Sequence, residues 1–234
     1  MREVPVIAAL DLETPEEALQ VASGLEGVLT HVKVGPRLFA MGGTALVEAL
    51  SSRFEVFLDL KLCDIPNTVA MAVEALSRMG IWALTLHACG GRRMLQEARS
   101  ASGGRTKLLG VTVLTSLDEG SFEEVCPGAK LDSTIRRRME LCAEAHLDGL
   151  VCSPLDLKLL PPACSGMIKV TPGVRAPGEA DDQARRATPF EAFSAGSDFL
   201  VIGRPLLRAE DKRALVERIL EDFEEARSHG EGRV

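Results

Sequence analysis

The sequence predicts a single-domain α/β protein, a (β/α)8 TIM barrel that spans residues 1–234. Eight short apolar runs recur along the chain, and the stretches between them are mostly long enough for a helix, which is typical of a parallel sheet. Eight is also the number of parallel strands that closes such a barrel. The length of 234 residues falls within the range of about 200–250 residues known for single barrels, and the 46% of hydrophobic residues can fill one large core.

The predicted strands follow directly from the apolar runs. They are residues 4–11, 31–35, 54–61, 83–88, 108–115, 149–153, 168–173 and 199–204. A doubly wound open sheet is the alternative arrangement, but it usually carries a glycine-rich loop after its first strand. The first run ends Ala9-Leu10-Asp11-Leu12-Glu13, without a glycine, and this favours the barrel.

Helices are expected between the strands. Thr14 is a suitable N-cap residue, Pro15 fits the first helical position, and Glu17 follows the cap by three residues. Residues 70–79 and 135–145 have the composition and the period of helices. The segment between the sixth and seventh runs is short and interrupted by three prolines, so the helix expected there has the weakest support.

Composition excludes several classes of partner. The net charge of -7 repels nucleic acid and anionic lipid, and one Trp with no Tyr leaves few rings for stacking on bases. No apolar run reaches the roughly 18 residues of a membrane span, and the N-terminus has no signal-peptide pattern. We therefore expect a cytoplasmic protein that binds neither nucleic acid nor membrane.

The cysteines favour free thiols over a disulfide framework or a structural metal. They are Cys63, Cys89, Cys126, Cys142, Cys152 and Cys164. None forms a C-x-x-C pair, and no histidine stands at zinc-ligand spacing from them. We expect no metal site and no cofactor, because no motif for either is found.

Polar residues stand where the predicted strands end. They are Asp11, Lys33, Asp59 with Lys61, His87, Thr115, Ser153, Arg175 just beyond Thr171-Pro172-Gly173, and Arg204 after Gly203. In a parallel barrel the carboxyl ends of all strands lie on one rim, which is where the active site is found. The sequence therefore predicts a charged pocket on that rim.

The third strand carries the most informative charges. Because side chains alternate between faces, Asp59 and Lys61 share the inward face with Phe57, and four aliphatic residues face the helices. The alternative is that Asp59 and Lys61 form an ion pair with a purely structural role. Burying charge is costly, however, and Lys33 points inward on the neighbouring strand. We therefore interpret the charges as an array that handles a charged substrate and a proton.

A second group of residues predicts a phosphate site. Arg175 and Arg204 supply forked donors, and Gly203 lets a phosphate approach the backbone where the last helix is expected to begin. Phosphate sites of barrels often follow strands seven and eight, which is this position. Residues 176–186 contain Pro177-Gly178 and a polar run, and we expect them to form a lid over the phosphate. The alternative is that both arginines are surface charges.

Seven stretches together resemble one enzyme family. They are Ala9-Leu10-Asp11, Lys33-Val34-Gly35, the run from Phe57 to Thr68 (FLDLKLCDIPNT), His87-Ala88-Cys89-Gly90-Gly91, Val111-Thr112-Val113-Leu114-Thr115-Ser116, Thr171-Pro172-Gly173-Val174-Arg175 and Val201-Ile202-Gly203-Arg204-Pro205. In this order the chain resembles the orotidine 5′-phosphate decarboxylases over residues 9–205. The D-x-K-x-x-D core is shared by a wider group of barrels, and Ile65-Pro66-Asn67-Thr68 with the two arginine motifs makes the match specific. Residues 118–132 carry no readable signature.

The resemblance implies roles for individual residues. It implies that Lys33, Asp59, Lys61 and Asp64 form the catalytic array, with Lys61 as the proton donor. Asp64 and Thr68 would reach into the site of a partner subunit, so the resemblance implies a homodimer with shared sites. Substrate contacts are implied for Asp11 and Lys33 at the ribose, Thr115 at the nucleotide, and Arg175, Gln183, Gly203 and Arg204 at the phosphate.

The implied activity is the decarboxylation of orotidine 5′-phosphate to UMP in de novo pyrimidine nucleotide biosynthesis. No cofactor motif supplies an electron sink, so preorganised charge, above all the ammonium of Lys61, would have to stabilise the carbanion. Two alternatives stay open. One is a metal-dependent decarboxylase or aldol-type synthase that acts on a keto-sugar phosphate. The other is a barrel that binds a nucleotide without catalysis.

Overall fold

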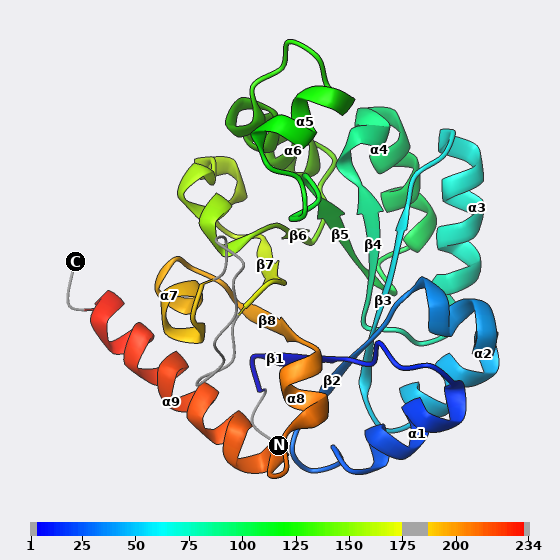
Figure 1. Cartoon of the computed structure of the whole chain (residues 1–234). Helices are drawn as coiled ribbons and strands as arrows, with labels where there is room; N and C mark the ends of the chain where they lie inside the picture. Colours follow the sequence, from blue (N-terminus) through cyan, green and yellow to red (C-terminus); the bar gives the residue numbers. More distant parts are fainter. Residues whose placement is uncertain (1–3, 175–186, 232–234) are drawn as a thin grey trace.

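Eight short apolar segments form a closed barrel of parallel strands in the computed structural model, which describes residues 4–174 and 187–231 (Figure 1). The strands are β1 (Val6–Ala9), β2 (His31–Val34), β3 (Glu55–Leu62), β4 (Ala83–His87), β5 (Lys107–Val111), β6 (Gly149–Val151), β7 (Ile168–Thr171) and β8 (Phe199–Ile202). Each strand pairs with its neighbour in sequence, and β8 pairs with β1. The predicted (β/α)8 barrel is therefore confirmed.

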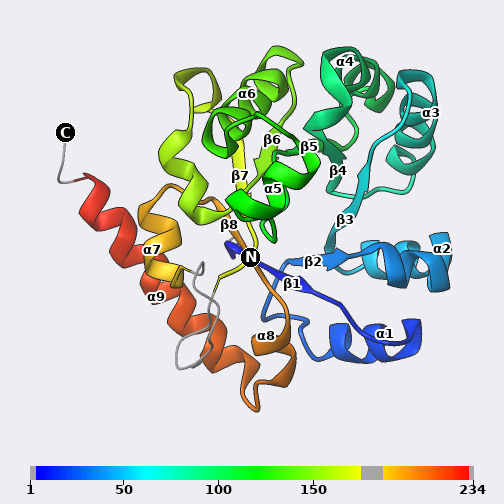
Figure 2. The ribbon, with the colours of Figure 1, turned by 45° about the horizontal axis from the view of Figure 1, so that its top comes forward.

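Helices surround the ring of strands (Figures 1 and 2). The α-helices are α1 (Pro15–Ser23), α2 (Pro36–Ser51), α3 (Pro66–Ser77), α4 (Gly91–Ser102), α5 (Glu119–Val125), α6 (Leu131–Glu144), α7 (Pro189–Ser194), α8 (Arg204–Arg208) and α9 (Lys212–Glu231). Three 3-10 helices join them: η1 (Ala88–Gly90), η2 (Pro154–Leu159) and η3 (Pro162–Cys164). The α-helix expected between β6 and β7 is thus replaced by η2 and η3. The prolines there have no N–H to donate, so a continuous α-helix cannot form across them, and each of these two 3-10 helices begins at a proline.

Several helices begin at a proline. Helices α1, α2, α3 and α7 each begin with a proline, whose missing N–H would have no partner in the first turn anyway. The predicted start of α1 is confirmed, because Oγ1 of Thr14 accepts the N–H of Glu17 at 3.1 Å. The Glu17 carboxylate in turn accepts the N–H of Glu13 at 3.1 Å. The cap thus fixes the start of α1 at Pro15, four residues after Asp11, and leaves Asp11 in the loop at the strand end.

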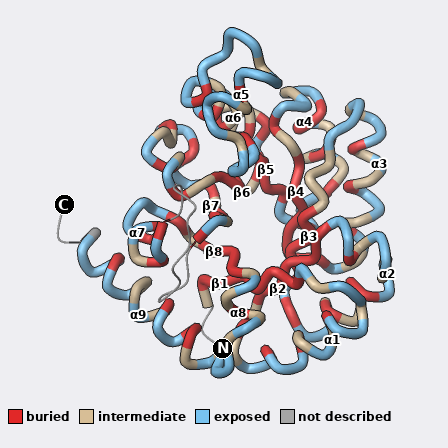
Figure 3. Tube along the Cα trace, in the orientation of Figure 1, coloured by how far each residue is buried: buried red, intermediate tan, exposed pale blue. Residues whose placement is uncertain are grey.

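The apolar side chains form two layers. The larger layer lies between strands and helices, and the smaller one fills the barrel interior. The strands between the two layers are largely buried (Figure 3). The interior residues are Ile7, Ala9, Phe57, Trp82, Ala83, Leu109, Val111, Val151, Val170, Phe199 and Val201. On β3 the predicted alternation is confirmed, since Phe57 points inward, while Val56 and Leu58, followed by Leu60 and Leu62, pack outward.

The pairing of β3 with β4 becomes irregular toward the end of β3. Leu58 pairs with Leu84 and Leu62 pairs with Leu86, so β3 advances four residues while β4 advances two. Two extra residues are therefore accommodated in an irregular stretch that contains Lys61, whose φ is 51°. Simple period-two alternation predicted neither the irregularity nor the left-handed backbone, which a residue with a Cβ adopts only when its surroundings require it.

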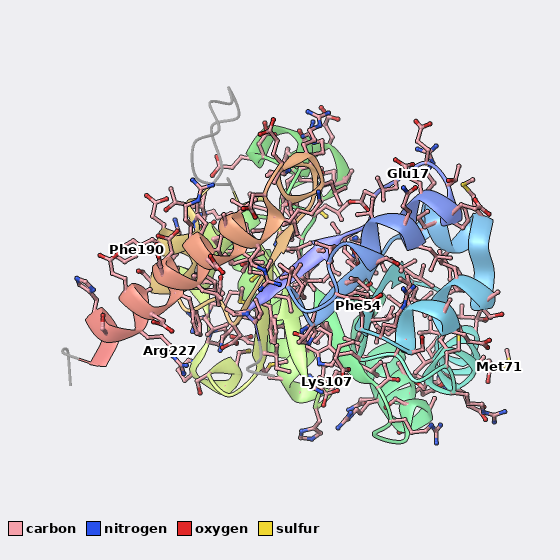
Figure 4. The ribbon with its side chains drawn as sticks, turned by 90° about the horizontal axis from the view of Figure 1, so that it is seen from below. Glu17, Phe54, Met71, Lys107, Phe190 and Arg227 are labelled. Carbon is pink, nitrogen blue, oxygen red and sulfur yellow. The ribbon has the colours of Figure 1, made fainter. Side chains whose placement is uncertain are left out.

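An aromatic cluster fills the amino-terminal end of the barrel. The His31 ring lies 4.6 Å from Trp82 and 5.0 Å from Phe199, and these two rings lie 5.2 Å apart, as centroid distances. Lys107 lies over the Trp82 ring at 5.6 Å. Figure 4 shows the barrel from the side, with Lys107 toward one end and Glu17, at the start of α1, toward the other. Substrate access is therefore expected at the end that carries Glu17.

Stability should fall on mild acidification because of His31. Burial, with a smaller contribution from the Lys107 ammonium, lowers the pKa of His31 from 6.5 to about 4. Between these two values the unfolded chain binds a proton that the native state does not, so stability decreases as pH falls from 6.5 toward 4. This histidine alone should cost about 2 kcal/mol between pH 7 and pH 5.

Urea unfolding of the wild type and of His31→Phe at pH 7 and pH 5 measures this effect. The variant cannot take up the proton, so its loss of stability between the two pH values should be smaller by about that amount. Equal losses in the two proteins would show that His31 titrates normally in the native state.

Candidate active site

A cavity of about 350 Å³ opens at the carboxyl ends of the strands. It is lined by Ala9, Asp11, Lys33, Phe57, Asp59, Lys61, Thr115, Val151, Pro172, Gly173, Val174, Val201, Gly203, Arg204 and Pro205. Apolar side chains from the barrel interior form part of its wall, and charged side chains from the strand ends complete it. Six residues predicted from the sequence, Asp11, Lys33, Asp59, Lys61, Thr115 and Arg204, thus lie around one cavity together with Gly203.

Four charged side chains form a chain of ion pairs across this cavity. The Lys33 ammonium lies 2.9 Å from Oδ1 of Asp11 and 3.8 Å from Oδ2 of Asp59. The Lys61 ammonium lies 2.8 Å from the same Oδ2 of Asp59. Positive and negative groups therefore alternate, from Asp11 through Lys33 and Asp59 to Lys61. Such a row presents two cations to a ligand while each carboxylate keeps a counter-charge.

Exposure differs along the row of charges. The side chains of Lys33 and Asp59 are each 11% exposed, whereas Lys61 is 33% and Asp11 60% exposed. The middle of the row is therefore removed from water, which strengthens its electrostatic interactions. Lys61, at the end of the row, keeps an ammonium that a bound molecule can reach.

Thr85 on β4 is a site residue that the sequence reading missed. Its side chain is fully buried, and its hydroxyl donates to Oδ1 of Asp59 at 3.0 Å. The same hydroxyl accepts the backbone N–H of Lys61 at 2.8 Å. The available signal was weak, because a threonine between Leu84 and Leu86 is also an ordinary strand residue.

His87 ends β4 close to the row of charges. Burial, followed by the positive charges of Lys61 and Arg138, lowers its pKa, so the imidazole is neutral at pH 7. Its Nδ1 makes no hydrogen bond to any of the described residues. Nearby, the exposed Cys63 and Cys89 have their Sγ atoms 3.9 Å apart and do not line the cavity. This placement gives no support to a nucleophilic role for Cys89.

The predicted phosphate end of the cavity is formed by Gly173, Gly203, Arg204 and Pro205. The expectation that Gly203 opens the last helix was wrong: Arg204 begins α8, which has five residues, and α9 follows as a separate helix. A helix this short adds little dipole, so an anion bound here would be held chiefly by the Arg204 guanidinium. Arg175, Gln183 and the expected lid at 176–186 lie outside the described residues.

Asp64 and Thr68 do not line the cavity of their own chain. Asp64 lies just past β3, is exposed, and accepts the backbone N–H of Ile65 at 2.6 Å. Thr68 is exposed in the first turn of α3. The exposed Ile65 and Met71 lie on the same segment, so these polar residues belong to a partly apolar outer face.

The fold and the cavity together define a (β/α)8-barrel enzyme whose pocket carries an alternating row of lysine and aspartate side chains. Comparison with known proteins specifies the class further. A model of the orotidine 5′-phosphate decarboxylase / HUMPS family matches residues 4–219. The chain therefore belongs to this family.

Individual relatives agree with this assignment. A Pseudomonas putida protein named orotidine 5′-phosphate decarboxylase is 45% identical over 215 residues, covering 89% of this chain and 92% of the relative. A Pseudomonas aeruginosa protein of the same name is 46% identical over 213 residues, covering 88% and 92%. The crystal structure of orotidine 5′-phosphate decarboxylase from Lactobacillus acidophilus matches with a TM-score of 0.84 and 34% identity, covering 94% of this chain and 99% of that one.

Proposed function

We propose that this chain, as one catalytic domain of residues 1–234, decarboxylates orotidine 5′-phosphate to UMP in de novo pyrimidine nucleotide biosynthesis without a cofactor. The observation that carries the proposal is the row of ion pairs that presents the ammonium of Lys61 in a cavity of nucleotide-binding size. The relatives named above bear the name of the same activity.

Lys61 performs two tasks in the proposed reaction. Cleavage of the bond between C6 of the pyrimidine and its carboxylate releases CO₂ and leaves the electron pair on C6. A fixed ammonium next to C6 stabilises that charge, and then it transfers a proton from Nζ to C6 to give UMP. The amine regains its proton from solvent. Asp59, 2.8 Å from Nζ of Lys61, orients the ammonium, and its charge next to the substrate carboxylate disfavours the ground state.

The remaining cavity residues bind the rest of the nucleotide. Asp11 and Lys33, paired at 2.9 Å, contact the ribose hydroxyls, and Thr115 contacts the nucleotide from the loop after β5. Gly203 and Arg204 bind the phosphate, together with Arg175 and Gln183. Binding energy gained at the phosphate, far from C6, holds the pyrimidine against Lys61.

Charge placement favours this reaction over a metal-dependent reaction of a keto-sugar phosphate. Lysine ammonium groups lie against both carboxylates that line the cavity, where a divalent cation would need open oxygen ligands. A barrel that only binds nucleotides is also disfavoured, since binding alone does not require two lysines on either side of a buried aspartate.

The active enzyme is proposed to be a cytoplasmic homodimer. Asp64 and Thr68 are exposed on the partly apolar face that includes Ile65 and Met71, and a twofold contact there would bring them to the partner's cavity. All six cysteines are free thiols, which suits a reducing compartment. Among the described residues, no helix has the length and apolar character that crossing a membrane requires.

Turnover of orotidine 5′-phosphate in excess EDTA tests the proposed function. Loss of the substrate, followed by absorbance, should proceed at the same rate with and without the chelator. Lys61→Ala keeps a Cβ at the strained position but lacks the cation. Its kcat should fall by more than the roughly 10²–10⁴-fold typical of general acid catalysis, because charge stabilisation is lost as well. Chelator-sensitive turnover, or a variant within tenfold of wild type, would contradict the mechanism.

Arg204→Ala tests the phosphate end of the cavity. Removing the guanidinium should raise KM for orotidine 5′-phosphate by about 10²-fold, in line with a hydrogen-bonded charge pair of about 2–3 kcal/mol. Turnover of the unphosphorylated nucleoside, which has no phosphate for Arg204 to bind, should be nearly unchanged. Arg208→Ala, in the last turn of the same short helix and outside the cavity, is the matched control. Equal losses for both substrates would show that Arg204 does not bind phosphate.

Mixed subunits test the shared site. In a heterodimer of Lys61→Ala with Asp64→Ala, one site collects both substitutions and the other has neither. Each heterodimer should therefore recover up to about half of wild-type activity. A mixture of Asp59→Ala with Lys61→Ala is the matched control, because both residues come from one chain and every site keeps a lesion. If subunits exchange and only background activity returns in both mixtures, Asp64 acts within its own chain.

A further inference from the structure

The Thr85 hydroxyl joins the two functional parts of β3. Its oxygen accepts the N–H of Lys61 at 2.8 Å, and its hydrogen is donated to Oδ1 of Asp59 at 3.0 Å. Because the N–H can only donate and the carboxylate can only accept, the direction of both bonds is fixed. Thr85 is fully buried, so water does not compete for either bond.

The two oxygens of the Asp59 carboxylate have different partners. Oδ1 is held by Thr85, whereas Oδ2 faces Nζ of Lys61 at 2.8 Å and Nζ of Lys33 at 3.8 Å. A carboxylate with one oxygen fixed cannot turn about its last torsion without breaking the bond to Thr85. The position of Oδ2, and hence of the ammonium of Lys61, therefore depends on the hydroxyl.

The same hydroxyl supports the unusual backbone of Lys61. Here β3 carries two extra residues relative to β4, so the regular backbone hydrogen bonds between the two strands are interrupted from Leu58 to Leu62. The N–H of Lys61 therefore donates to the side chain of Thr85 and not to a backbone carbonyl. A left-handed lysine, at φ 51°, persists only where such bonds compensate the strain. Of the strand residues on β4, Thr85 supplies this acceptor from the inward face.

We propose that Thr85 is a positioning residue of the catalytic array: it fixes the Asp59 carboxylate and the backbone of Lys61, and so sets the place of the Lys61 ammonium relative to the substrate. This inference rests on the proposed decarboxylase function. It adds that the array depends on a neutral hydroxyl that does not touch the substrate. A threonine is suited to the role, because its Cβ branch fits a strand while its hydroxyl both donates and accepts.

Three substitutions at Thr85 test the proposal through kcat and KM for orotidine 5′-phosphate. Thr85→Val keeps the shape but removes the hydroxyl, and it should lower kcat by about 10²-fold, the scale of a 1 Å misplacement, while KM changes by less than about threefold. Thr85→Ser keeps the hydroxyl and should stay within about threefold of wild-type kcat. Thr85→Ala replaces Val in the comparison with Ser if the Val variant does not fold.

A matched control separates positioning from general stability. Thr106 is likewise buried, and its hydroxyl donates to the Ile81 carbonyl at 3.4 Å, next to the start of β5 and away from the cavity. Thr106→Val should lower the melting temperature but leave kcat near wild type. The proposal is wrong if kcat of the hydroxyl-free variant stays within threefold of wild type, or if Thr85→Ser is impaired as strongly as that variant.

Crystal structures of the Val (or Ala) and Ser variants give a readout that does not depend on the substrate. Without the hydroxyl, the Asp59 carboxylate should turn or Lys61 should leave its left-handed backbone, whereas the Ser variant should keep both. An unchanged array in the hydroxyl-free variant overturns the proposal. If the wild type does not turn over orotidine 5′-phosphate at all, the proposed function fails, and the crystal structures still decide whether Thr85 positions the array.

Discussion

The buried carboxylate of Asp59, held between two lysines and a threonine, is the interaction on which the rest of the site depends. An ion of this kind is expensive to remove from water unless counter-charges and hydrogen bonds surround it. The barrel supplies these from three adjacent strands, with Lys33 on β2, Lys61 on β3 itself and Thr85 on β4. Lys33 and Thr85 are far from Asp59 in sequence, so the arrangement exists only when β2, β3 and β4 pair in this register.

The strand order also separates two charged regions of the cavity. Lys33, Asp59 and Lys61 come from β2 and β3, whereas Gly203 and Arg204 follow β8, on the far side of β1. A molecule that reaches both regions must lie across the mouth of the barrel. A phosphorylated nucleoside has this shape, with its charged group well separated from its base.

The sequence was sufficient for the strands and for most charged residues of the cavity. Apolar runs of strand length are governed by burial, which a one-dimensional pattern records, and charges at their ends must lie on one rim once the strands are parallel. The irregular end of β3 could not be predicted, because it depends on which residues of β3 and β4 pair, and pairing is not encoded in either strand alone. For the same reason Thr85 passed as an ordinary strand residue. The short α8 was missed because Arg204-Pro205 starts a helix equally well whether five or twenty residues follow.

The aromatic cluster of His31, Trp82 and Phe199 determines by which route substrate and products enter and leave the cavity. Together with the packed barrel interior, this cluster closes the amino-terminal end of the barrel as far as the described residues extend. The cavity is therefore open only at the carboxyl-terminal end of the strands. Substrate, nucleotide product and CO₂ must all pass the same rim, and no molecule can leave through the floor while another still occupies the mouth. Because the cavity has one mouth, fresh substrate cannot enter until the bound nucleotide has left through the same opening.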